Sequence, residues 1–566
     1  MTKNKWEDCE IVINKKQKDY EYLEKEDINV FIYGYPFNEI TKCWISAIDI
    51  YDQYSKNELN FVHHIEGVYG IIIIDRQKGK CSVIIDRYGV YNFFYFKNSN
   101  HFIISDKISE IIAFISSIKL NEHSIIEYLI FGYGLKLGNK THIEGIYEFE
   151  GSIIYQIDRA LNMTQERYWE FLSKSKKKIT NEKFQEIFNL HILTGLNLEE
   201  MISFPLTGGL DTRTIMSASL SKKDKLHCCT YGVKNAVDVR LAKEITNHFG
   251  IKHSFYELDG FFIKNLPNNL EKNIDLFNGL IPTLNHLSYK ELCEREEKMG
   301  ELMVWGLLGN EVWRSFYGYL IKKKQNITIN DLAHLIARGS VNRNLVKIFK
   351  NYNKISLLNL LKNSVKNEFS NIPNTTNTEM LLDLFTFRNF SSNWASNLIK
   401  FCGTYFKIFL ALINKKLLVE LQKFELEERI SGSIQKYIIT NNNSYLANLP
   451  LNTGQSISPL SKCKNLFNHI IYLINEYSEM MIKRRIFKIS KQHGIHNWLR
   501  NYHKDFIINT LNYEKMVTKN LFKKEVLDKI INLYLNGNNS VYVFISSLIS
   551  LEIWLKKIKK ETEIII

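Results

Sequence analysis

The chain has 566 residues, of which 45% are hydrophobic and 24% are charged. This length predicts two or more domains, and this balance is ordinary for a soluble globular protein. The formal net charge of +14 would suit a nucleic-acid ligand. However, basic and acidic residues alternate along the chain, and no basic stripe with interleaved aromatic residues is present. We therefore expect a solvated basic surface and no nucleic-acid partner.

The cysteines and the apolar segments of the sequence indicate a soluble protein. The eight cysteines include no CxxC pair, and we expect them to be free thiols in a reducing compartment. The first residues lack the apolar stretch that is typical of a signal peptide. The most apolar late run, residues 541–555, contains Glu552 and is too short to span a membrane. We predict a cytoplasmic protein with no membrane partner.

The first part of the chain is predicted to be rich in β-structure. Short apolar runs alternate with polar turns, and this spacing is typical of antiparallel hairpins. Helical spacing is present at residues 111–118 and 123–130. The expected strands are residues 68–74, 81–85, 90–95 and 102–105.

A strand, a glycine-containing loop and a helix follow one another near residue 207. The apolar run at residues 201–206 predicts a buried strand, and a helical pattern begins at Thr212. Adjacent glycines let a ligand approach the backbone, and we expect loop N–H groups, a hydroxyl and the helix N-terminus to converge on an anion. Asp211 is then expected to bind Mg²⁺ beside that anion. The expected nucleotide-binding residues of this loop are Leu206, Thr207, Gly208, Gly209, Leu210, Asp211 and Thr212.

The next segments predict a parallel sheet. Residues 227–232 and 251–257 are apolar runs typical of strands, and residues 238–250 form an amphipathic helical pattern that ends at Gly250. Alternating strands and helices indicate a parallel sheet covered by helices, which binds ligands beyond the carboxyl ends of its strands. Residues 326–480 are predicted to be largely helical.

Two ordered sets of motifs resemble the asparagine synthetase family. Residues 204–213 resemble the pyrophosphate loop Ser-Gly-Gly-x-Asp-Ser of its ATP pyrophosphatase domain, with threonines at both serine positions. Residues 66–70, 86–89 and 168–169 are similar to motifs of its N-terminal glutamine amidotransferase domain. The resemblance implies an α+β domain of the N-terminal-nucleophile type at residues 1–172. It also implies an α/β ATP pyrophosphatase domain at residues 180–566, with a parallel sheet and a large helical portion.

The glutaminase chemistry of the family is not matched. Glutaminases of this type use an N-terminal cysteine whose own α-amine acts as the base. Here Thr2 occupies that place, and Cys9 would need the removal of eight residues to become terminal. Thr2 as an N-terminal nucleophile is an alternative. We predict an inactive glutaminase, with this domain kept as a structural remnant or a docking surface.

Residues 303–313 are similar to the family segment Ser-Gly-Glu-Gly-Ala-Asp-Glu-Leu-Phe, with two departures. Asn310 stands where the resemblance places the second Mg²⁺ ligand, and an amide oxygen brings no charge. Leu307 stands where the family has a glutamate, whereas Glu311 is retained as a catalytic candidate. The further residues that we expect near the nucleotide are Tyr231, Gly232, Trp305 and Gly306.

The family also has a lysine that contacts the ATP phosphates, and residues 488–500 resemble its surroundings. Counting back from Trp498 selects Lys488, whereas alignment on the Gly-Ile pair selects Lys491. Both stay candidates for stabilising charge during adenylation and amide formation, and a surface lysine is the alternative.

The function implied by the resemblance is an AMP-forming amide ligase that uses ATP and Mg²⁺. It would adenylate a carboxylate of a small-molecule or peptide substrate and join it to an amine, as β-lactam synthetases and lasso-peptide cyclases do. A precursor-peptide-processing protein is a candidate partner. Asparagine synthesis from aspartate and ammonia is one alternative. A non-catalytic protein that binds a nucleotide or a partner is another, because Leu307 and Asn310 change a catalytic segment.

Overall fold

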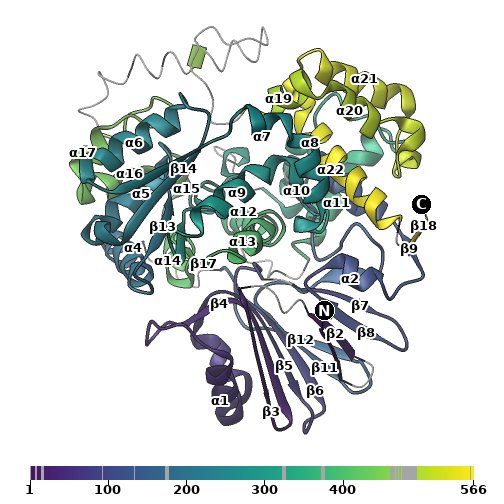
Figure 1. The fold of residues 1–566 in the computed structure, drawn as a ribbon, viewed down its shortest axis with the longest axis horizontal. Coiled ribbons are helices and arrows are strands. Elements are labelled where there is room, and N and C mark those ends of the chain that lie inside the picture. Colours follow the sequence, from purple (N-terminus) through teal and green to yellow (C-terminus); the bar gives the residue numbers. More distant parts are fainter. Residues whose placement is uncertain are drawn as a thin grey trace.

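The computed structural model has a lower layer of antiparallel sheets and an upper region built on a parallel sheet with many helices (Figure 1). The chain is therefore a mixed α/β protein. The structure describes residues 2–6, 9–13, 18–91, 93–132, 134–172, 178–321, 327–370, 372, 377–458, 466, 470, 473–474, 494–560 and 562–565.

The larger antiparallel sheet has six strands in the order β12-β11-β6-β5-β4-β3. Its central strand β5 is apolar on both faces because it separates two cores. Ile72 and Ile74 belong to the main core, whereas Ile71 and Ile73 pack with the helix α1. The strands are β3 (Tyr20–Lys25), β4 (Ile28–Asn38), β5 (Ile65–Asp75), β6 (Lys80–Ile85), β11 (Ile153–Asp158) and β12 (Met163–Arg167).

A second sheet of five strands has the order β1-β2-β8-β7-β10, and only the β2–β8 pair is parallel among its described strands. The strand predicted at residues 90–95 is wrong in position, since β7 begins at Phe94. The buried carboxylate of Asp86 accepts the N–H groups of Tyr88, Val90 and Tyr91, and this turns the chain before the strand can start. The strands are β1 (Thr2–Trp6), β2 (Cys9–Ile13), β7 (Phe94–Lys97), β8 (Phe102–Ser105) and β10 (Ile146–Glu148).

The helix predicted at residues 111–118 is also corrected. Helix α2 covers Ile108–Ile112, and Ser117–Lys119 forms a strand, β9, in a two-stranded parallel pair with β18 (Glu563–Ile565). The local pattern could not reveal a partner strand that lies at the other end of the sequence. The helix predicted at residues 123–130 is confirmed as α3 (Glu122–Phe131).

The parallel sheet has five strands in the order β15-β14-β13-β16-β17, and every described pair in it is parallel. The predicted strands match β13, β14 and β15, and Gly250 ends helix α6 with a φ of +67°. Strand β17 lies in the region predicted to be helical, because pairing with β16 overrides the local pattern. The strands are β13 (Ile202–Pro205), β14 (Leu226–Gly232), β15 (Lys252–Glu257), β16 (Leu302–Trp305) and β17 (Lys407–Leu410).

Helices surround the parallel sheet and extend from it to the first part of the chain. Near the C-terminus, helix α22 packs on α3, where the Tyr128 hydroxyl donates to the carbonyl of Ser547. Among the described residues, no helix is both long enough and apolar enough to cross a bilayer. The remaining helices are α1 (Ala47–Asn57), α4 (Asn181–Leu196), α5 (Leu210–Ser219), α6 (Val237–Phe249), α7 (Gly260–Lys264), α8 (Leu266–Lys272), α9 (Thr283–Glu296), α10 (Ile329–Ser340), α11 (Lys354–Asn367), α12 (Thr378–Thr386), α13 (Ser396–Gly403), α14 (Lys415–Leu421), α15 (Leu426–Ile430), α16 (Ser433–Asn442), α17 (Ser444–Asn448), α19 (Ile495–Tyr502), α20 (Lys504–Thr510), α21 (Lys524–Leu535) and α22 (Tyr542–Ile558).

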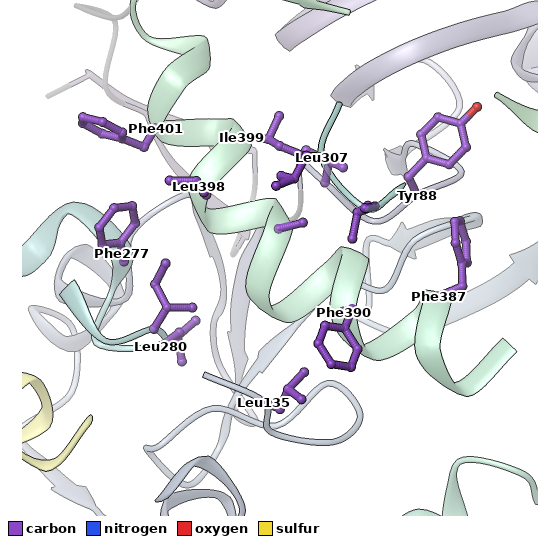
Figure 2. Packing of buried hydrophobic residues seen from close by; sticks show 14 of the residues in the cluster. Tyr88, Leu135, Phe277, Leu280, Leu307, Phe387, Phe390, Leu398, Ile399 and Phe401 are labelled. Carbon is purple, nitrogen blue, oxygen red and sulfur yellow. The ribbon is translucent and has the colours of Figure 1, made fainter. Parts of the chain in front are cut away.

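The two regions share one apolar core. Figure 2 shows Tyr88 and Leu135 of the first region beside Leu307 and the π-helical segment η6 (Phe387–Ala395) of the second. A buried ion pair accompanies this core, because Lys136 Nζ lies 3.0 Å from Glu148 Oε2 and donates to Asn393 Oδ1 at 2.8 Å. The antiparallel layers are thus fixed against the parallel-sheet region and do not form a separate globule.

Candidate active site at the edge of the parallel sheet

The strand order brings the sequence-predicted loops to one edge. Strands β14 and β15 lie on one side of β13, and β16 and β17 lie on the other. Because all five strands run in the same direction, the segments that follow β13, β14 and β16 emerge at the same edge. A reversal of strand order at this position is where open α/β sheets bind ligands. The residues from 206–212, 231–232 and 305–311 meet there.

The loop after β13 has the form expected of an anion cradle. Thr207 Oγ1 and Thr212 Oγ1 lie 3.1 Å apart, and the Gly209 N–H donates to Thr207 Oγ1 at 3.2 Å. Helix α5 begins at Leu210 without a side-chain cap on its first N–H groups. These N–H groups and the helix dipole favour an anion at this end of the helix.

One amide of the predicted cradle is used within the protein. The Gly208 N–H does not point toward a shared anion site, because it donates to Asp238 Oδ1 at 2.8 Å. Asp238 also accepts a hydrogen bond from Asn452 at 3.1 Å, and burial raises the pKa of its carboxyl. A buried carboxylate requires donors, and the loop amide supplies one. Gly208 is nevertheless required by close packing, since a Cβ there would lie 2.4 Å from Leu241 Cδ1.

Arg213 holds the loop from behind. Its side chain is 0% exposed. The guanidinium donates to the carbonyl of Gly208 at 3.2 Å and to those of Leu449 and Pro450 at 2.8 and 2.9 Å. Burial among these neutral acceptors lowers its pKa to about 10. Arg213 therefore fixes the loop to the chain after α17 and does not contact the face where an anion would bind.

Asp211 lies at the centre of a charged cluster. Arg314 Nη2 donates to its Oδ2 at 3.2 Å, and Gln435 Nε2 donates to its Oδ1 at 2.7 Å. The carboxylate also rests against Gly309, where a Cβ would lie 2.6 Å from Asp211 Cγ. Sequence reasoning missed Arg314 and Gln435. Gln435 gave no signal, since it is 224 positions from Asp211.

Part of the segment after β16 packs into the apolar core. Leu308 has a left-handed backbone with a φ of +68°, which is the conformation that favours glycine. Leu307 is only 8% exposed and belongs to the apolar cluster of Figure 2. Asn310 is exposed on the π-helical turn η4 (Gly309–Trp313). Burial, with a smaller contribution from Asp211, raises the pKa of the adjacent Glu311 carboxyl.

Aromatic rings line the strand ends on either side of β13. Tyr231 is the next-to-last residue of β14, which ends at Gly232, and its ring centroid lies 5.5 Å from that of Tyr289 on α9. Tyr289 in turn lies 5.7 Å from Trp305, which ends β16 before Gly306. The rings are inclined to one another by 60° and 49°, so this row offers aromatic contacts to a base and not one continuous plane.

The described residues also limit the possible metal ligands. In this part of the chain no group of three or more His, Cys, Asp and Glu side chains is arranged to hold a metal ion. Asp211 and Glu311 are near enough to interact electrostatically, and the Asn310 amide hydrogen-bonds Glu311. These donors fit an oxygen-ligated Mg²⁺ that keeps several waters. Lys488 and Lys491 lie outside the described residues.

Two comparisons with known proteins each found a match to this chain. Residues 48–169 match the family described as a glutamine amidotransferase domain. A protein of Methanocaldococcus jannaschii, described as "Putative asparagine synthetase [glutamine-hydrolyzing] 2", is 24% identical over 260 residues. That alignment covers 44% of this chain and 48% of the relative.

Together, the two matches support an asparagine synthetase-family protein. The chain spans about half the length of the curated relative that it matches, with 48% of that relative aligned. The fold described above, with antiparallel sheets in the matched region and a parallel sheet after it, is consistent with this similarity.

Proposed function

We propose that this protein is an ATP-dependent, AMP-forming amide ligase that activates a carboxylate and joins it to an amine. The observation that carries the proposal is the loop from Thr207 to Asp211. It follows the central strand of the parallel sheet, and it opens the uncapped helix α5. In the proposed assignment, residues 180–566 form the synthetase domain around this loop, and residues 1–172 form the amidotransferase-like domain.

The residues of the edge have distinct proposed roles. The Thr207 and Thr212 hydroxyls and the first N–H groups of α5 would bind the pyrophosphate portion of ATP. Asp211 and Glu311, with the amide of Asn310, would hold Mg²⁺, whose charge would neutralise the leaving pyrophosphate. Tyr231, Trp305 and the adjoining glycines would receive the base and sugar. Lys488 or Lys491 would stabilise the developing charge.

Asp211 must change partners for this assignment to work. Both of its oxygens accept hydrogen bonds, from Arg314 and from Gln435. Carboxylate oxygens have about four acceptor sites in all, so Asp211 keeps capacity for a metal ion. Arg314 would then be free to turn toward the bound phosphates, where a guanidinium binds well.

The amine is proposed to be a substrate amine or free ammonia. In the first region, the side chain of Cys43 is exposed in a turn and that of Cys81 is fully buried in β6. Burial of Cys81 keeps its thiol from contact with a substrate glutamine. We propose a role in natural-product or peptide biosynthesis, including lasso-type ring closure. Asparagine formation from aspartate and ammonia is the alternative suggested by the name of the relative.

A non-catalytic nucleotide-binding role is favoured by one observation. Asp211 is paired with Arg314, and the neighbouring segment has an apolar Leu307 and an uncharged Asn310. In such a protein Arg314 would keep Asp211 neutralised and no metal would be recruited.

Mg²⁺-dependent exchange of pyrophosphate into ATP tests the proposal. The full chain would be assayed with aspartate and with candidate peptides, and ATP binding would be measured by calorimetry in parallel. Exchange with one acid, abolished in Asp211→Asn, would establish adenylation and identify the acid. ATP binding without exchange for any acid would favour the non-catalytic role. If the protein shows no ATP binding and no exchange, both proposals are contradicted.

A further inference from the structure

A second pocket lies between the two regions of the chain, away from the loop residues at the edge of the parallel sheet. Its volume is about 450 Å³, which is sufficient for an amino-acid-sized ligand. One wall is formed by the turns that precede β7 and β11 and by lining residues of the chain as far as Trp169 and Glu170. The other comes from the end of α11 and from η6. Every residue that lines it belongs to the described part of the chain.

Three aromatic rings form one side of this pocket. Tyr88, Trp169 and Phe387 all line it, and their ring centroids lie 5.8 to 6.4 Å apart in pairs. Tyr88 and Phe387 also belong to the apolar cluster of Figure 2, which includes Leu307. The rings thus provide an apolar wall, and their faces attract a cation.

The arginines of the pocket already have carboxylate partners. Arg388 Nη2 lies 2.5 Å from Glu170 Oε2, and Arg167 lies 3.7 Å from the same carboxylate. Arg87 is buried, with Nη1 3.3 Å from Glu66. Their positive charge is therefore largely neutralised before any ligand enters.

The remaining carboxylates retain open acceptor positions. Glu148 is 3% exposed and lines the pocket, and its Oε1 is among the buried atoms with no hydrogen-bond partner in the described structure. Its other oxygen is bonded to Lys136. Glu368 accepts one hydrogen bond from Asn389 at 3.2 Å. Glu150 also lines the pocket, and its Oε2 lies 3.9 Å from Arg167 Nη2. A buried acceptor without a donor is costly, so such an atom indicates a missing partner.

We infer that this pocket binds a small organic cation, a primary ammonium with an apolar body. The ammonium group would donate hydrogen bonds to Glu148 and Glu368, and the apolar body would rest against Tyr88, Trp169 and Phe387. In a ligase such a molecule belongs to the class of the amine substrate, and in that respect the inference rests on the proposed function. As a binding site the pocket does not require ATP.

The electrostatics of Glu368 support a cationic ligand. Its pKa is raised to about 7, with burial as the largest cause; Glu150 and Glu127 also act to raise it, whereas Asn389 and Arg388 act to lower it. A bound ammonium would favour the ionised carboxylate and lower this pKa. Part of the free carboxyl population is protonated near neutral pH, so binding of the cation should release protons.

The test uses 2-phenylethylammonium and its neutral analogue 2-phenylethanol with the full chain and no ATP. Isothermal titration calorimetry at pH 7 should give a Kd below about 1 mM for the cation and binding at least about tenfold weaker for the alcohol. Repeating the titration in phosphate and in Tris should change the observed enthalpy for the cation only, because only the cation displaces a proton.

Variants identify the residues that bind the cation. Glu368→Gln should weaken cation binding about tenfold, and Glu150→Gln, which removes only a neighbouring negative charge, should weaken it less; both should leave 2-phenylethanol binding unchanged. These are preferred to Glu148→Gln, which would leave the buried Lys136 without its carboxylate. Glu144→Gln is the matched control, since that side chain is 47% exposed and does not line the pocket.

Three results would overturn the inference: no cation binding at about 10 mM, equal affinity for the amine and the alcohol, or unchanged binding in both pocket variants. Asp211→Asn separates this inference from the proposed function. It should retain cation binding even where it abolishes pyrophosphate exchange. If cation binding is present and exchange is absent for every acid, the pocket stands and the ligase proposal fails.

Discussion

The two loops that follow β13 and β16 at the edge of the parallel sheet are held in different ways. The loop after β13 keeps its hydroxyls and glycines, and its Gly208 carbonyl and N–H are held by Arg213 and Asp238. The segment after β16 has an apolar Leu307 within the core and places Leu308 in a left-handed conformation. The first loop is supported from behind by buried hydrogen bonds, whereas the second places apolar side chains in the core.

This difference in support predicts a difference in tolerance to substitution. A loop that is anchored by buried hydrogen bonds is expensive to change, because each lost partner leaves a desolvated group. A segment whose side chains face a crevice can exchange a carboxylate for leucine if an apolar cluster is nearby to receive it. Leu307 lies in such an apolar cluster, as Figure 2 shows.

The largest expected effect is on the first loop. Asp211→Asn should reduce Mg²⁺-dependent pyrophosphate exchange by about a thousandfold, because the site loses its main carboxylate ligand. Thermal stability should hardly change, since Asn can still accept from Gln435. Asp224→Asn, an exposed position, is the control and should keep full exchange. Undiminished exchange in Asp211→Asn would show that the first loop is as degenerate as the second.

Removal of the support behind the first loop should come next. Arg213→Met keeps the aliphatic stem but leaves the carbonyls of Gly208, Leu449 and Pro450 without their donor. We expect a loss of about 3 kcal/mol in the free energy of unfolding, measured by chemical denaturation. A loss below about 0.5 kcal/mol would mean that the loop does not depend on this anchor.

Restoration of a carboxylate in the second segment should be unfavourable. Leu307→Glu would place a charge within the apolar cluster and should cost about 2 kcal/mol of stability, despite the resemblance to the family pattern. Leu190→Glu provides the comparison, because Leu190 is 55% exposed and should tolerate the change. Equal stability of the two variants would show that Leu307 has not become a packing residue.

The smallest expected effect is at Asn310. Asn310→Asp adds a carboxylate at an exposed position beside Glu311 and should tighten Mg²⁺ binding about fivefold, or about 1 kcal/mol. Titration of Mg²⁺ in the exchange assay measures this, with the exposed Asn100→Asp as the control. Unaltered Mg²⁺ dependence would place the metal away from this segment.

Much of the fold could be predicted because its signals are local. Strands β5, β6, β8, β13, β14 and β15 and helices α3, α5 and α6 each have an apolar pattern within a short stretch. The failures depended on distant partners. Strand β9 pairs with β18 near the C-terminus, and β17 pairs with β16 about a hundred residues earlier. Periodicity within one segment carries no information about such pairs.

The sequence by itself determined the order of strand, Thr-Gly-Gly loop and helix at residue 207, and the carboxylate at Asp211. Local backbone preferences and a buried apolar run are enough to specify these. Only the tertiary structure decided that Arg314 and Gln435 reach Asp211, that Asp238 takes the Gly208 N–H, and that Leu307 is buried. These contacts join residues that lie far apart in the chain, and they form only when packing of the whole core sets the distance between their elements.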